Sequence, residues 1–192
     1  HKALYQKYKN DVTLLGPNLK GVKTGLVVPD YMSANSISDL TTQANKTITG
    51  IEPGAGEMAT AEKTLKAYPN LSGWNLSSSS SGAMVSALAK AYKNKQDIVV
   101  TGWSPHWMFG KYHLKYLADP KNTFGSSETI NTIVSKKLKS SDPKAYQVLD
   151  KFHWTKDDME SVMLEIQNGK SPKQAAADWI KKHKKLVDSW YQ

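Results

Sequence analysis

Residues 98–107 read Ile-Val-Val-Thr-Gly-Trp-Ser-Pro-His-Trp, an apolar run that ends in aromatic and turn-forming residues. Its β-branched part, Ile98 to Gly102, predicts a buried strand. Trp103 comes at the end of that strand, and Pro105 fixes the backbone so that the loop does not continue as a strand. An indole held at a strand end in this way can be presented to a ligand, although for a tryptophan taken alone a place in the core is the favoured interpretation. Trp107 is interpreted as packing support for the same loop.

Residues 50–56 read Gly-Ile-Glu-Pro-Gly-Ala-Gly and follow a second short apolar strand, Thr47 to Ile51. Glycines allow a tight turn with exposed amide groups, and a helix that begins after such a turn directs its positive end toward the same point. The turn is therefore a candidate anion site. Many turns between a strand and a helix contain two glycines, so a purely structural turn is the alternative at this stage.

Strands and helices alternate along the rest of the chain. β-Branched runs predict strands at Val22 to Val28 and Thr129 to Ser135, and apolar residues at helical spacing predict helices at Glu57 to Tyr68 and Ser81 to Asn94. This alternation predicts an α/β layer fold with mostly parallel strands, whose ligand sites lie at the carboxyl ends of the strands. Both motifs described above are at such ends.

Short polar motifs mark the starts of further helices. Three helices in the C-terminal third are predicted to begin at Asp142-Pro143, at Thr155 with Asp158, and at Ser171-Pro172 with Gln174. Asn168-Gly169 predicts the end of the middle one. The serine run of residues 77–81 leads directly into a helix, so we interpret it as a turn with a helix cap rather than a flexible linker.

The composition is that of a folded domain. The chain has 192 residues, 39% of them hydrophobic, with six Trp and nine Tyr, so it is long enough for one domain or two small lobes. No stretch approaches the roughly 18 apolar residues of a membrane span. Because there is no cysteine, disulfides and thiolate chemistry are excluded, and a zinc site would need His and carboxylates alone. We expect no cofactor and no metal.

The formal charge of +9 raises the question of an anionic partner. The lysines are scattered, and the densest run, residues 181–185, is predicted to lie on the polar face of the last helix as a solvated surface. A basic module that binds anionic lipid or nucleic acid is the alternative interpretation. The chain has no RNA-binding or helix-turn-helix signature, so nucleic acid is not an expected partner.

Sequence motifs for catalysis are missing. There is no His-Glu-x-x-His, Walker or Gly-x-Ser-x-Gly motif, and the histidines His106, His113, His153 and His183 are isolated along the chain. Asp157-Asp158 begins a helix, where two carboxylates favour the helix dipole. We therefore expect no enzymatic activity, and a hydrolase built on His106 ranks last among the hypotheses.

Several motifs together resemble one protein family over the whole chain. They are Gly50 to Gly56, Thr101 to Phe109, Leu114 to Leu117 with Asp119-Pro120-Lys121, and Gly25 to Pro29 with Tyr31-Met32. In these motifs the chain resembles the substrate-binding domains of osmoregulatory ABC importers for glycine betaine, of the OpuA and ProX kind. It is most similar to the form that is fused to the permease subunit in lactic acid bacteria.

The resemblance implies a type II periplasmic-binding-protein-like fold with two lobes that close on a ligand. Tryptophans would surround the trimethylammonium group, with Trp103 as one wall, and the backbone amides of Gly56 and Glu57 would bind the carboxylate. His1 would hydrogen-bond the ligand from the second lobe. His106 and Trp107 would support the site. The carboxylate side chain of Glu57 must then point away from the anionic end of the ligand.

The resemblance also implies a domain organisation and a location. The other tryptophans of the family's box precede His1, so residues 1–17 would be the tail of the second lobe and residues 18–192 would form one nearly complete lobe. On this interpretation the chain is a fragment of a longer protein. It would capture glycine betaine, and also proline betaine, at the extracellular face of the membrane for the permease subunit to which it is tethered.

Overall fold

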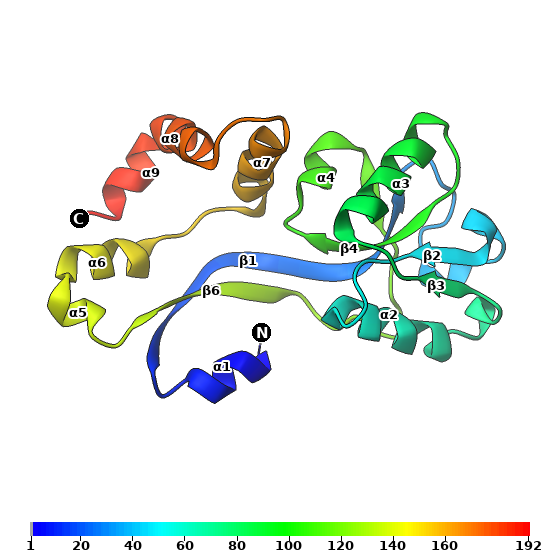
Figure 1. The fold of residues 1–192 in the computed structure, drawn as a ribbon, viewed down its shortest axis with the longest axis horizontal. Coiled ribbons are helices and arrows are strands. Elements are labelled where there is room, and N and C mark those ends of the chain that lie inside the picture. Colours follow the sequence, from blue (N-terminus) through cyan, green and yellow to red (C-terminus); the bar gives the residue numbers. More distant parts are fainter. Residues whose placement is uncertain (1) are drawn as a thin grey trace. The chain divides into compact units, whose positions relative to one another are not determined.

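The computed structural model describes residues 2–192, with side chains described from Tyr5 onward. The chain divides into two compact units, which are treated separately below. The sheet unit is Lys23–Ser127, and the helical unit contains the residues up to Val22 together with Glu128–Gln192 (Figure 1). His1 lies outside the described residues. The assignment of residues 1–17 and 18–192 to two lobes of a complete protein stays a prediction.

The sheet unit is built on a mixed sheet with strand order β3-β2-β4-β1-β5 (Figure 1). Its strands are β1 (Val12–Pro29), β2 (Thr47–Thr49), β3 (Asn75–Ser77), β4 (Val99–Ser104) and β5 (Leu114–Tyr116). Strand β2 pairs in parallel with β3 and β4, whereas β1 pairs antiparallel with β4 and β5. The expectation of mostly parallel strands is therefore confirmed, since β2, β3, β4 and β5 all run in one direction. Parallel pairing is limited to strands joined by helical crossovers, and β1 runs against its neighbours.

Helices connect the parallel strands of the sheet unit. They are α2 (Gly56–Ala67), α3 (Ser81–Lys93) and the short α4 (Trp107–Lys111), with 3-10 turns at Ile37–Asp39, Gln43–Lys46 and Pro69–Leu71. The predicted helices at 57–68 and 81–94 thus form within a residue of their expected bounds. The side chain of Ser80 accepts a hydrogen bond from the amide of Ala83, which confirms the serine run as a helix cap.

Apolar side chains cover both faces of this sheet around β1 and β4, which are buried at successive positions. On β1, Leu26 and Val28 belong to one buried group and Val27 to the other. The second group includes Met58 from α2 and Met84 and further side chains of α3. The buried strands therefore hold the turns that follow them in fixed positions.

The helical unit contains a two-stranded ribbon and a set of capped helices. The first half of β1 pairs antiparallel with β6 (Glu128–Ser135). The helices are α1 (Lys2–Tyr8), α5 (Leu138–Ser141), α6 (Pro143–Lys151), α7 (Lys156–Gln167), α8 (Pro172–Lys182) and α9 (Lys184–Ser189). The three predicted caps are confirmed, because the side chains of Asp142, Thr155 and Ser171 each accept a hydrogen bond from the amide three residues on.

The lysine run of residues 181–185 does not lie on one helix. It spans the junction between α8 and α9, because His183 leaves the helical conformation and ends α8. The imidazole of His183 stacks on the indole of Trp179, with 4.4 Å between the ring centroids, and this contact holds the break in place. The lysine side chains there are exposed. Among residues 2–192, no helix combines the length and the apolar character needed to cross a bilayer.

Candidate functional site

Trp103 lies on the last part of β4, opposite Thr24 of β1. The strand extends to Ser104, so the tryptophan is on the strand and not after it. Gly102 precedes it at a point of close packing, where a Cβ atom would come within 2.5 Å of Val27 Cγ2. The indole of Trp103 packs partly against the second apolar group and is partly exposed.

The two tryptophans of this region differ in what covers their rings. The Nζ atom of Lys111 lies 5.6 Å from the ring centroid of Trp107, a distance typical of a cation–π contact. Among residues whose side chains are described, no lysine lies over Trp103. The indole face of Trp103 is therefore not used by a cation of the described chain.

His106 connects the two tryptophans. Its ring meets Trp103 edge-on at 4.6 Å and stacks on Trp107 at 5.4 Å between centroids. Its Nδ1 atom accepts a hydrogen bond of 3.1 Å from the amide of Met108, so the neutral ring carries its proton on Nε2. Burial lowers the pKa of His106 to about 4. The imidazole is thus uncharged at neutral pH and does not repel a cation near Trp103.

The glycine turn of residues 50–56 places the start of α2 at the same edge of the sheet. Gly54 has a φ of +88°, which glycine adopts without strain, and the amide of Ala55 donates to the carbonyl of Glu52 at 3.2 Å. Ala55 is the N-cap residue of α2 and has no side-chain acceptor. Within the described chain, the amides of Gly56 and Glu57 have no hydrogen-bond acceptor. Two first-turn amides are therefore available to an anion.

The side chain of Glu57 connects this helix start to β4. Burial raises the pKa of the Glu57 carboxyl to about 7, and the nearby amide of Gly102 opposes that rise. The Oε1 atom is buried and has no hydrogen-bond partner in the described part of the protein. Glu57 therefore lies beside the residue that precedes Trp103. The two sequence motifs meet within the sheet unit, while the ligand-binding roles of their residues stay predictions.

One contact of the turn was missed in the sequence. The carboxylate of Glu52 accepts hydrogen bonds from the amide and the hydroxyl of Ser81, at 2.8 Å and 2.9 Å. The sequence signal was a glutamate in the middle of a glycine turn, but nothing local pointed to a partner 29 residues away. Among residues with described side chains, no group of three His, Asp or Glu residues could hold a metal ion.

Comparison with known proteins places this geometry in a family. Residues 1–182 match the family described as the substrate binding domain of ABC-type glycine betaine transport systems. The chain is 52% identical over 153 residues to GbuC of Listeria monocytogenes, a glycine betaine/carnitine transport binding protein. The alignment covers 79% of this chain and 51% of GbuC, so the chain spans about half the length of this curated relative.

Solved structures agree with this match. Lactococcal OpuAC, in a closed conformation complexed with glycine betaine, is 67% identical with a TM-score of 0.87, covering 100% of this chain and 76% of that chain. ProX of Borrelia burgdorferi, a glycine betaine and L-proline-binding protein, is 32% identical with a TM-score of 0.80, covering 100% and 74%. These similarities confirm the α/β fold of type II periplasmic binding proteins.

Proposed function

Because this chain belongs to the family of substrate-binding domains of ABC-type glycine betaine transport systems, we propose that it takes part in binding glycine betaine for import. The observation that supports the proposal is the meeting of two motifs in the sheet unit. Glu57, at a helix start with two free amides, lies beside Gly102, and Gly102 directly precedes Trp103, whose indole no described lysine covers. Glycine betaine has one cationic and one anionic end. The cationic end could contact the indole face, and the anionic end could accept hydrogen bonds from the amides.

The chemistry of the cation explains the choice of an indole. A quaternary ammonium group has no N–H to donate, and aromatic faces attract it through their quadrupole. Each face contributes about 0.5 to 2 kcal/mol, whereas micromolar affinity requires about 8 kcal/mol. Trp103 alone is therefore insufficient. The proposal needs further aromatic faces from the rest of the protein and a hydrogen-bonded carboxylate.

The amides of Gly56 and Glu57 supply the proposed carboxylate site. Hydrogen bonds to a charged acceptor are stronger than those between neutral groups, and the helix dipole adds to them. The neutral imidazole of His106 supports the indole, and Trp107 stacks behind it. We also propose that His1 is a donor from the second lobe and that residues 1–17 are part of that lobe. Proline betaine carries the same two charged groups and is the second expected ligand.

The cellular role follows from the family. A substrate-binding domain of an importer works on the extracellular side of the membrane, delivers its ligand to the permease subunit and performs no chemistry on it. We propose that this chain does the same, tethered to the membrane through the transporter. Closure of the two lobes around the ligand would give the permease a form to recognise.

The competing function is a basic surface that binds anionic lipid or nucleic acid through the lysines. Ionic strength separates the two, because binding through lysines weakens strongly between low and moderate salt, whereas a caged zwitterion has little net charge to screen. Glycine betaine should be titrated calorimetrically into the full-length protein at both salt levels. Equal affinities support betaine binding, and a lack of heat at either level contradicts it.

The first variant to test is Trp103→Ala. Loss of one aromatic wall should weaken glycine betaine binding about tenfold or more, since a desolvated cation–π contact contributes up to about 2 kcal/mol. Trp103→Phe keeps a smaller aromatic face and should lie between the wild type and the alanine variant. An unchanged affinity in Trp103→Ala would remove this residue from the site.

A further inference from the structure

The glycine turn of residues 50–56 is joined to the serine run of residues 77–81 by a series of hydrogen bonds. The amide of Gly50 donates to the carbonyl of Ser77 at 2.8 Å, and the hydroxyl of Ser79 donates to the carbonyl of Gly50 at 2.6 Å. The amide of Ser79 donates to the carbonyl of Ile51 at 3.0 Å. The two segments thus continue the parallel pairing of β2 with β3 beyond the ends of the strands.

Glu52 fixes the turn from two sides. Its carboxylate binds the amide of Ser81 at 2.8 Å and the hydroxyl of Ser81 at 2.9 Å, at the first residue of α3. These hydrogen bonds, the amide of Ser81 first among them, lower the pKa of Glu52. Its own carbonyl accepts from the amide of Ala55, the N-cap residue of α2. One residue therefore ties the start of α3 to the start of α2.

Close packing adds to this arrangement. A Cβ atom at Gly50 would lie 2.4 Å from the sulfur of Met58, and the amide of Ile51 donates to that sulfur at 3.2 Å. The amide of Met58 in turn donates to the carbonyl of Ala55 at 3.0 Å. The start of the glycine turn, at Gly50 and Ile51, therefore packs against Met58 of α2. Glu52 holds the following part of the glycine turn.

We propose that Glu52 is a positioning residue, which holds the amides of Gly56 and Glu57 in the orientation that binds the ligand carboxylate. This inference rests on the proposed function of the same site. A preorganised pair of donors avoids the cost of ordering the turn when the ligand arrives. Glu52 acts through the turn and does not touch the ligand.

The negative charge of Glu52, considered alone, would weaken binding of the ligand carboxylate. A carboxylate near an anion site repels a second carboxylate, so removing that charge without changing the turn should favour the ligand. Glu52→Gln removes the charge and keeps an oxygen that accepts from the amide of Ser81. Glu52→Ala removes both. A positioning role therefore predicts that the two variants differ, with the glutamine variant near the wild type or slightly tighter in glycine betaine affinity.

Hydrogen exchange of the full-length protein without ligand tests the positioning itself. The readouts are the amides of Ala55 and Met58, which bind backbone carbonyls and not the Glu52 side chain. Their exchange should be about three- to tenfold faster in Glu52→Ala and close to the wild-type rate in Glu52→Gln. Unchanged exchange in the alanine variant would overturn the proposal.

Calorimetric titration with glycine betaine then tests the link to the ligand. Glu52→Ala should bind about three- to tenfold more weakly than the wild type, the loss expected when charge-assisted hydrogen bonds at an exposed position disappear. Glu62→Ala is the matched control, since it removes one exposed glutamate from the middle of α2. Faster exchange in Glu52→Ala with unchanged affinity would also overturn the proposal.

The two measurements keep this inference separate from the proposed function. If the wild type binds no glycine betaine, the proposed function fails, and the exchange rates still decide whether Glu52 orders the turn. If the wild type binds and both Glu52 variants match it, the proposed function stands while the positioning role is wrong. A control that weakened binding as much as Glu52→Ala would show that the loss does not depend on the contact between Glu52 and Ser81, and would also contradict the inference.

Discussion

At the residue scale, the ionisation of Glu57 is the most informative property of the candidate site. Burial raises the pKa of its carboxyl from 4.5 to about 7, so a change in pH near neutrality alters the charge next to the first-turn amides. A negative charge there opposes a ligand carboxylate. Glycine betaine affinity should therefore rise as the pH falls from about 8 to about 6. Calorimetry at both pH values measures this.

The matched variant for this prediction is Glu57→Gln. It keeps the backbone amide and the size of the side chain but cannot ionise, so its affinity should not vary with pH in this range. Because burial holds the pKa of His106 near 4, that ring stays neutral in this pH range and does not contribute to the pH dependence of the affinity. A pH dependence that persisted in Glu57→Gln would assign the effect to another group.

The same carboxyl also influences stability. In the folded state Glu57 has a pKa of about 7 and in the unfolded state about 4.5, so the folded state binds more protons between these values. The free energy of unfolding should therefore fall as the pH rises through this window. Glu57→Gln should be more stable than the wild type by up to about 3 kcal/mol at about pH 8, and about equal near pH 4.

Urea unfolding of both proteins across this pH range measures the difference. Comparing the variant with the wild type is necessary because His106 acts in the opposite direction. Burial lowers the pKa of His106 from 6.5 to about 4, so the unfolded state binds more protons in that window and stability falls as the pH drops. A gain in Glu57→Gln that did not grow with pH would contradict the linkage.

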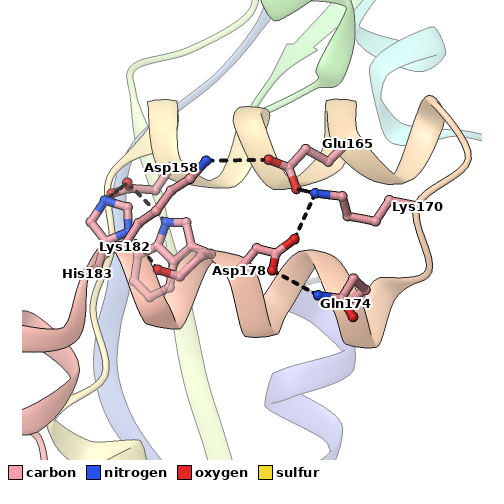
Figure 2. A network of polar contacts seen from close by, with 8 residues as sticks. Asp158, Glu165, Lys170, Gln174, Asp178, Lys182 and His183 are labelled. Carbon is pink, nitrogen blue, oxygen red and sulfur yellow. Dashed lines mark hydrogen bonds and ion pairs between the residues drawn. The ribbon is translucent and has the colours of Figure 1, made fainter.

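At the element scale, Asp158 holds the start of α7 against α8. Its carboxylate accepts from the amide of Thr155 at 2.9 Å and from the indole Nε1 of Trp179 at 3.1 Å. It also lies 3.3 Å from Nε2 of His183 (Figure 2). Burial acts to raise the pKa of Asp158, but these hydrogen bonds, those from Thr155 first, outweigh it and lower the pKa.

Asp158→Ala should therefore reduce the free energy of unfolding by about 2 to 3 kcal/mol, since it removes one half of the capping box of α7 and leaves the indole N–H of Trp179 without its acceptor. Asp157→Ala is the control. It removes a charge from the same helical turn but leaves these bonds intact, so its cost should be about 0.5 kcal/mol. Equal losses in urea unfolding would mean that only the charge matters.

Ion pairs between α7 and α8 lie near the contact made by Asp158. Lys170 lies between Glu165 of α7 and Asp178 of α8, at 2.7 Å and 2.9 Å, and Lys182 lies 3.8 Å from Glu165 (Figure 2). These side chains are more exposed than Asp158, and exposed ion pairs contribute little. They also engage two lysines with carboxylates, which reduces the positive charge that an anionic partner would meet.

The helix caps were predictable from the sequence because a cap and its amide are three residues apart. The predicted starts at Asp142, Thr155 and Ser171 were confirmed for that reason. Strand pairing was harder, because the direction of a neighbour depends on residues far along the chain. The antiparallel position of β1 beside β4 and the contact of Glu52 with Ser81 both depend on such distant pairs.

At the scale of the whole protein, the proposed function depends on the closure of two lobes around a ligand. We expect saturating glycine betaine to shift the full-length protein toward a closed form, because only closure brings the donors and aromatic faces of both lobes to one ligand. Small-angle scattering should then give a smaller radius of gyration with ligand than without. A radius that stays constant at saturation would count against closure.

The family and its fold could be predicted from several short motifs taken together, because motifs such as the glycine turn and Trp-Ser-Pro-His-Trp are local in sequence. The site could be predicted only in part. The free amide of Glu57 follows from the alanine at the N-cap of α2, which has no side-chain acceptor. The buried, partner-free oxygen of Glu57 depends on how α2 packs beside β4, and no local pattern indicates that.

The most direct test of the central claim is nuclear magnetic resonance of the isotope-labelled full-length protein, titrated with glycine betaine. The backbone amides of Gly56 and Glu57 should shift as they donate to the ligand carboxylate, and the indole N–H of Trp103 should shift over the same concentration range. Saturable binding that left all of these resonances in place would contradict the account.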